Sequence, residues 1–197
     1  MAKNNKTIDR IQAVWNILGG EDGVDKLLRG ELMVSSAVLP SQTVWKTITL
    51  ATYKDLRSLE AALRLAHCKM NDYVRKLLNM SVFRLLPVRV KFDLVVRSVA
   101  ELGFEEPATY PQICDRALEL GLSLCLAEVG PALRLAYLDQ PPDEYLRIAM
   151  CPIVDMGNCR IFSVNHEFDG LKLAWTGGNA DTVWKLSERL VFTLLRK

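Results

Sequence analysis

The stretch DLRSLEAALRLAHCKMNDYVRKLLNM, residues 55–80, is the most regular part of the chain. Its apolar residues recur in alternating steps of three and four, at Leu56, Leu59, Leu63, Ala66, Met70, Tyr73, Leu77 and Met80. This spacing places them on one face of a helix, as in a heptad seam. The pattern therefore predicts one long heptad-patterned helix, or two stacked helices, over residues 55–80.

Two interpretations of this apolar stripe remain open. The favoured one is packing against the chain's own core, because Met70 and Tyr73 are poor residues for a coiled-coil seam. The alternative is a seam that faces a protein partner or a second copy of the chain. In that case the binding residues would be Leu56, Leu63, Met70 and Leu77.

The residues before this stretch predict a helical hairpin at the N-terminus. Apolar residues from Ile8 to Leu18 have helical spacing, and Gly19-Gly20 ends that helix. Val24, Leu27 and Leu28 then indicate a second, short helix that ends near Gly30. Residues 32–35 and 44–52 are rich in β-branched side chains and are predicted to be strands.

The residues after it predict mostly strands. Apolar and polar residues alternate from Val88 to Val96, as in a half-buried strand. A helix also fits this segment, with Phe92, Val95, Val96, Val99 and Leu102 on one face. The stretch Thr109-Tyr110-Pro111-Gln112 has the signature of a capped helix start. In the last third, Asp169-Gly170 predicts a hairpin turn and Leu190–Leu194 a final strand. We therefore expect an antiparallel sheet at the C-terminal end.

Together these patterns predict an α+β fold. It would have an N-terminal helical hairpin, a long heptad-patterned helix and a C-terminal antiparallel sheet. Residues 1–104 would be a helix-rich part, and residues 105–197 a helix plus the sheet. The two parts could also form one continuous domain.

Composition favours a reduced, cytoplasmic protein. The five cysteines are odd in number and widely spaced, without a Cys-x-x-Cys pair for zinc. The sequence shows neither a secretory signal nor an apolar run long enough to cross a membrane. We therefore expect neither a metal, nor a cofactor, nor membrane association.

Charge is separated along the chain despite a net charge of only +2. Residues 54–91 contain nine basic and three acidic residues, whereas residues 101–155 contain ten acidic and three basic ones. The basic region could bind nucleic acid, with Arg57, Arg64, Arg75 and Lys76 as contacts. We favour solvated or mutually facing surfaces, because aromatic residues for stacking on bases are sparse there.

The inventory for catalysis is small. Only two histidines are present, His67 and His166. Glu128 and Arg134 flank Gly130-Pro131 and could line a cleft, with His166, as an acid and an anion clamp. An ordinary ion pair between Glu128 and Arg134 is the favoured interpretation.

Two blocks of sequence carry a resemblance. The first is Trp15-Asn16-Ile17-Leu18-Gly19-Gly20 followed by Gly23-Val24, and the second runs from Gly121-Leu122-Ser123-Leu124-Cys125 through Ala127-Glu128-Val129-Gly130-Pro131 to Leu133-Arg134-Leu135. They resemble a family of small uncharacterised bacterial proteins from uncultured, genome-reduced lineages, over residues 8–30 and 88–195. This chain has Leu126 where such proteins have proline. The resemblance implies a bacterial cytoplasmic origin and brings no activity with it.

The sequence thus favours a non-catalytic binding or adaptor protein of the bacterial cytoplasm. The first alternative is a nucleic-acid-associated protein that uses the basic region 54–91. The second is an enzyme with a carboxylate and arginine site near Glu128 and Arg134.

Overall fold

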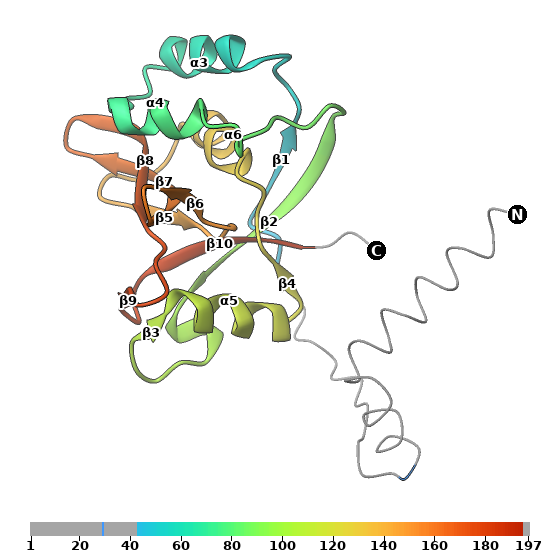
Figure 1. Ribbon diagram of the computed structural model, residues 1–197, viewed down its shortest axis with the longest axis vertical. Coiled ribbons are helices and arrows are strands. Elements are labelled where there is room, and N and C mark those ends of the chain that lie inside the picture. Colours follow the sequence, from blue (N-terminus) through green and yellow to red (C-terminus); the bar gives the residue numbers. More distant parts are fainter. Residues whose placement is uncertain (1–28, 30–42, 195–197) are drawn as a thin grey trace, which may run out of the picture. The chain divides into compact units, whose positions relative to one another are not determined.

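The computed structural model describes residue 29 and residues 43–194 (Figure 1). The chain divides into two units, Met1–Leu39 and Pro40–Lys197, and every described helix and strand belongs to the second. The predicted helical hairpin over residues 8–30 and the predicted strand over residues 32–35 lie outside the described residues.

A curled, eight-stranded mixed sheet forms the centre of this unit. Its main path runs in the order β1 (Lys46–Leu50), β2 (Val90–Ser98), β10 (Arg189–Leu194), β5 (Tyr145–Ile148), β7 (Asn158–Glu167) and β6 (Ile153–Asp155). Two further strands join it from the side, β4 (Leu122–Ser123) on β10 and β8 (Gly170–Gly177) on β7.

Short elements cover this sheet. The helices are α3 (Leu56–Leu65), α4 (Asp72–Leu78), α5 (Tyr110–Glu119) and α6 (Val129–Ala136), with a 3₁₀ turn at Ala100–Leu102. A separate two-stranded sheet joins β3 (Ala108–Thr109) to β9 (Val183–Trp184). Figure 1 shows α3 and α4 on one side of the large sheet and α5 on the other. Among the described helices, none is long and apolar enough to cross a membrane.

The predicted fold, in which an antiparallel sheet is confined to the C-terminal end, is wrong. Strands β1 and β2 precede residue 105, yet they form one end of the same sheet. Strand β10 lies between β2 and β5, antiparallel to the first and parallel to the second. The cause is a long-range pairing that local patterns do not encode, because Val191 lies opposite both Val96 and Ile148.

Of the two arrangements left open for residues 55–80, the structure shows two helices, and the single long heptad-patterned helix is wrong. Helix α3 ends at Leu65, and His67 then adopts a left-handed backbone conformation with φ of +52°. Asn71 caps the new helix α4 by accepting a 2.9 Å hydrogen bond from Val74 N. Between the two helices, the main chain of Lys69 hydrogen-bonds to Leu171 and Leu173 of β8. The apolar stripe is therefore interrupted by His67, by the helix cap at Asn71 and by the contact of Lys69 with β8.

Several local predictions are confirmed. Strand β1 lies within the β-branched stretch 44–52, and β2 and β10 lie where strands were predicted at Val88–Val96 and Leu190–Leu194. Helix α5 begins with the expected capping box, in which Gln112 Oε1 accepts a 2.9 Å hydrogen bond from Thr109 N. The predicted hairpin joins β7 to β8, but Glu167 lies opposite Gly170, so its two turn residues are Phe168 and Asp169, one residue earlier than predicted.

Helix α6 connects the layers, because it contacts β1, β7, β8 and α3. Its residues Val129, Leu133 and Arg134 are all fully buried. The close approach of α6 to the sheet places Glu128 and Arg134 inside the protein, where the sequence had suggested a cleft.

Candidate functional site

Arg134 is fully buried, with 0% of its surface exposed, and it binds backbone and amide oxygens rather than an acid. Its Nη1 donates to Gln140 Oε1 at 2.5 Å and to Asn165 O at 3.2 Å, and its Nη2 donates to Tyr137 O. Burial lowers the pKa of Arg134, and the neighbouring Cys68 thiol, whose pKa burial raises, partly offsets this effect. The guanidinium therefore holds the loop after α6 in place.

His166 belongs to the same internal network. Its Nδ1 lies 2.6 Å from Gln140 O, and because a carbonyl can only accept, Nδ1 carries the proton. Gln140 also donates through Nε2 to the carbonyls of Glu144 and Val164. Gln140 thus links Arg134 to His166, and the result is a clamp on residues 137–144 rather than an open site.

Glu128 is separate from that clamp and only 4% exposed. Its Oε1 accepts from Ala51 N at 2.7 Å and its Oε2 from Leu86 N at 2.8 Å. It borders a cleft of about 220 Å³ between α3, β1 and α6. Because each oxygen satisfies a backbone amide, the carboxylate joins the end of β1 and the segment after α4 to α6. No described contact pairs Glu128 with Arg134.

The basic residues named for nucleic-acid binding are exposed but partly neutralised. Arg75 pairs with Asp72 at 2.7 Å, and Lys76 pairs with Asp155 at 2.6 Å. Arg57 and Arg64 lie on the exposed surface of α3. Of the four predicted nucleic-acid contacts, Arg75 and Lys76 therefore already pair with acidic residues of the same chain.

The residues named for a partner-facing seam point mainly inward. Leu63 and Leu77 are fully buried, and Leu56 and Met70 are half-buried against the core. In this structure a second chain has no access to Leu63 or Leu77. A binding surface must therefore be sought elsewhere, and the outer strands of the sheet are the places to look.

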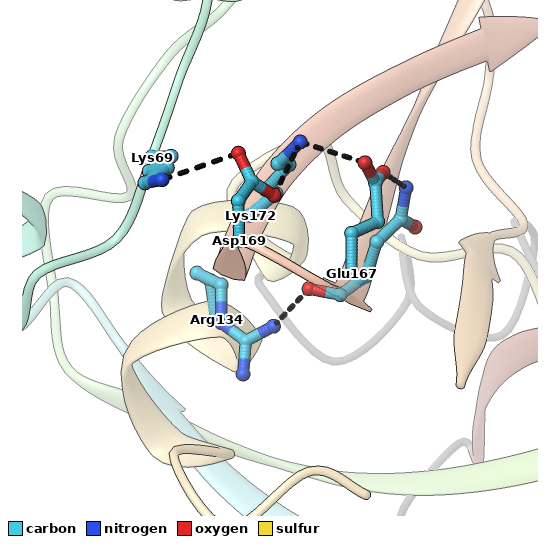
Figure 2. A network of polar contacts seen from close by, with 6 residues as sticks. Lys69, Arg134, Glu167, Asp169 and Lys172 are labelled. Atoms are coloured by element: carbon cyan, nitrogen blue, oxygen red, sulfur yellow. Dashed lines mark hydrogen bonds and ion pairs between the residues drawn. The ribbon is translucent and has the colours of Figure 1, made fainter. Parts of the chain in front are cut away.

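The outer edge of β8 is closed by main-chain contacts and by charge. Lys69 N donates to Leu171 O at 2.9 Å, and Lys69 O accepts from Leu173 N at 3.0 Å. Figure 2 shows the charges beside this contact, where Asp169 joins Lys69 to Lys172 and Lys172 reaches Glu167. Charged side chains along an edge are a common protection against pairing with another strand. Strand β8 is therefore a protected edge.

The outer edge of β6 lacks this protection among the described residues. In the β6–β7 hairpin, Asp155 pairs with Asn158 next to the two-residue turn, so Val154 and Cys159 form the non-hydrogen-bonded pair. Cys159 accordingly turns its N–H and C=O toward Asn179 and Gly178 on the other side of β7. Val154 then directs its own N–H and C=O outward, and no described residue bonds to them.

An apolar groove lies along this free edge. Its volume is about 340 Å³, and its lining includes Val82, Leu126, Ala127, Pro152, Ile153 and Val154. Val154 is 59% exposed, and Val82 and Leu126 are exposed as well. A free strand edge beside exposed apolar side chains is the arrangement that adds an extended segment of another chain.

Met156 at the tip of the β6–β7 hairpin adds to this surface. It is 91% exposed and adopts a left-handed conformation with φ of +48°, followed by Gly157 with φ of +79°. These values are those of a type I′ turn, in which asparagine or aspartate is preferred at the first position. A large apolar side chain there lies in solvent at a position that disfavours it, which points to a binding role.

Thiol and metal chemistry have little support within residues 43–194. Cys68, Cys114 and Cys125 are buried, and burial raises the pKa of Cys114 to about 11. No group of three or more histidine, cysteine, aspartate or glutamate side chains in these residues could hold a metal ion. Cys151 is exposed and borders the groove beside β6.

Comparison with protein-family models, with curated protein sequences and with solved structures returned no match to this chain. The β6 edge and its groove are thus the candidate site on physical grounds alone. Sequence reasoning missed them because a hairpin at Met156-Gly157 lacks the usual turn residue, although the glycine was a usable signal.

Proposed function

We propose that this chain is a non-catalytic binding protein. Its partner adds an extended polypeptide segment to the outer edge of β6 and places apolar side chains in the adjacent groove. The outward N–H and C=O of Val154, next to exposed Val82 and Leu126, carry the proposal. Main-chain hydrogen bonds would supply affinity, and the groove would select alternate side chains of the segment.

The internal bonding of the other polar groups supports a binding role over an enzymatic one. Glu128, Arg134 and His166 are each engaged with backbone or amide atoms of the same chain. At β6, by contrast, no described residue bonds to the outward N–H and C=O of Val154. The proposal keeps the adaptor class that the sequence favours and moves its site from the heptad stripe to a strand edge.

Selection from a random peptide library displayed on phage, against the immobilised full chain, tests this function. We expect selected peptides that alternate apolar and polar residues and bind with micromolar affinity. Val154→Pro removes the outward N–H, so it should weaken binding of a synthetic selected peptide at least about tenfold. Val154→Thr keeps the N–H and a β-branched side chain, and serves as the matched control.

Two outcomes would contradict this function. One is the absence of any peptide that binds the wild-type chain above background. The other is a set of peptides whose affinity is unchanged in Val154→Pro, because their site would then lie elsewhere. Circular dichroism of both variants checks that each retains the wild-type fold.

A further inference from the structure

We propose that the partner at the β6 edge is a second copy of this chain, in a dimer formed by antiparallel pairing of β6 with β6. This inference rests on the proposed function and names its partner. An outward N–H and C=O on one residue form a self-complementary pair, because each can bond to the same residue across a two-fold axis. Val154 would then lie opposite Val154 of the second copy.

The register that follows brings the apolar parts together. With Val154 on the axis, residue 156 of one copy lies opposite residue 152 of the other. Met156 therefore meets Pro152 of the second copy, which borders its groove. Met156 of each copy would thus contact the apolar groove of the other copy. The two-fold axis generates this contact twice.

Charge at the edge favours this occupant. Ile153 and Val154 carry none, and the carboxylate of Asp155 is paired within its own chain to Lys76 at 2.6 Å and accepts from Tyr73 Oη at 2.8 Å. Two copies can therefore approach without repulsion between like charges. The β8 edge differs, because Lys69, Lys172, Glu167 and Asp169 gather there (Figure 2). Of these two edges, that of β8 is protected by charge, whereas the self-complementary edge of β6 is open.

Sedimentation velocity and light scattering of the full chain, from low micromolar concentration to about 1 mM, test the dimer. We expect the mass to rise with concentration toward twice the 22.2 kDa of one chain. Val154→Pro should remain at the mass of one chain throughout, and Val154→Thr should behave as wild type. A wild-type mass of 22.2 kDa at every concentration would overturn the dimer.

Met156→Asn gives a test that loss of folding cannot explain. Asparagine is the preferred residue at this turn position, so the hairpin should become more stable while the apolar contact is lost. We expect a dissociation constant at least about tenfold higher than that of wild type. A dimer of unchanged strength in this variant and in Val154→Pro would place the interface elsewhere and contradict the proposal.

Cross-linking tests the register directly. In a Cys151→Ser background, Val154→Cys should form an intermolecular disulfide on mild oxidation, since paired residues in adjacent strands have Cα atoms about 5.5 Å apart. Val183→Cys is the matched control, because Val183 is 60% exposed and Val154 59%. Equal cross-linking of the two variants would argue against the register. A strictly monomeric chain that still binds selected peptides through Val154 would remove the dimer and leave the binding function standing.

Discussion

Gly130 of α6 lies directly against Phe162 of β7. A methyl group placed on Gly130 would stand 2.8 Å from the Cβ and 3.0 Å from the Cγ of Phe162. Phe162 is fully buried and cannot move aside freely. Glycine at this position is what allows α6 to approach the sheet closely enough to bury both Glu128 and Arg134.

Gly130→Ala should therefore destabilise the protein, although alanine is the better helix former. The gain in helix propensity is about 1 kcal/mol, whereas overpacking of a rigid core costs about 1–3 kcal/mol. We expect a net loss of about 1 kcal/mol in urea unfolding. Gly177→Ala is the control, because its new methyl group would meet Thr182 at an ordinary 3.6 Å. An equal effect of the two changes would show that packing against Phe162 is not limiting.

Glu128→Gln should cost about 2 kcal/mol of unfolding free energy. The carboxylate accepts one amide hydrogen bond on each oxygen, and the glutamine amide would turn an NH₂ group toward one of those two donors. Denaturant unfolding measures the loss, and hydrogen exchange at Ala51 and Leu86 should be faster. Glu119→Gln, at an exposed site on α5, should change stability by less than about 0.5 kcal/mol. Unaltered exchange at Ala51 would contradict the bridging role.

Arg134→Met should destabilise the clamp on residues 137–144. The change removes the donors to Tyr137 O, Asn165 O and Gln140 Oε1 and leaves those buried acceptors short of partners. We expect a loss of about 3 kcal/mol. Arg64→Met on the exposed surface of α3 is the matched control and should be nearly neutral. Both are read from urea melts at neutral pH, and near-neutrality of Arg134→Met would refute the clamp.

The Lys76–Asp155 pair should contribute a pH-dependent part of stability. Hydrogen bonds from Lys76 and then Tyr73 hold the pKa of Asp155 below its ordinary value. A depressed carboxyl pKa stabilises the fold above the unfolded value, about pH 4, and this contribution is lost as pH falls through the folded value. Asp155→Asn should therefore flatten the fall in the urea midpoint below about pH 4. Asp181→Asn, at an exposed position, should keep the wild-type slope.

Local features of this fold could be predicted from the sequence where one short signal decides them. The Thr109–Gln112 capping box, the alternation along β2 and the hairpin signalled by Asp169-Gly170 are of this kind. Each depends on a few neighbouring residues whose hydrogen bonds form within the same element.

The break in the heptad stripe, between α3 and α4, was harder to predict from the sequence. Asn71-Asp72 is a reasonable helix start, but the regular apolar spacing around it is the stronger signal. The insertion of β10 between β2 and β5 could not be predicted from the sequence. Val191, Val96 and Ile148 are all ordinary strand residues, and only the tertiary structure specifies that they pair.

The binding edge could not be predicted for a related reason. Whether Val154 directs its amide outward depends on the pairing phase of the hairpin, and a shift by one residue would reverse it. The groove beside it combines Val82 with residues from two later segments. The buried clamp is equally hidden, since Gln140 lies in a stretch that indicates only a turn, whereas it is the hub between Arg134 and His166.

The central place of β10 has a consequence for how the polypeptide is made. Ribosomes release the chain from its N-terminal end, so β2 and β5 emerge long before the strand that separates them. Until β10 has been synthesised, β2 and β5 each have an unpaired edge to which a strand of a neighbouring nascent chain could pair. Completion of the sheet must then wait until β10 has been synthesised, and chaperones that shield unpaired strands would matter most during that interval.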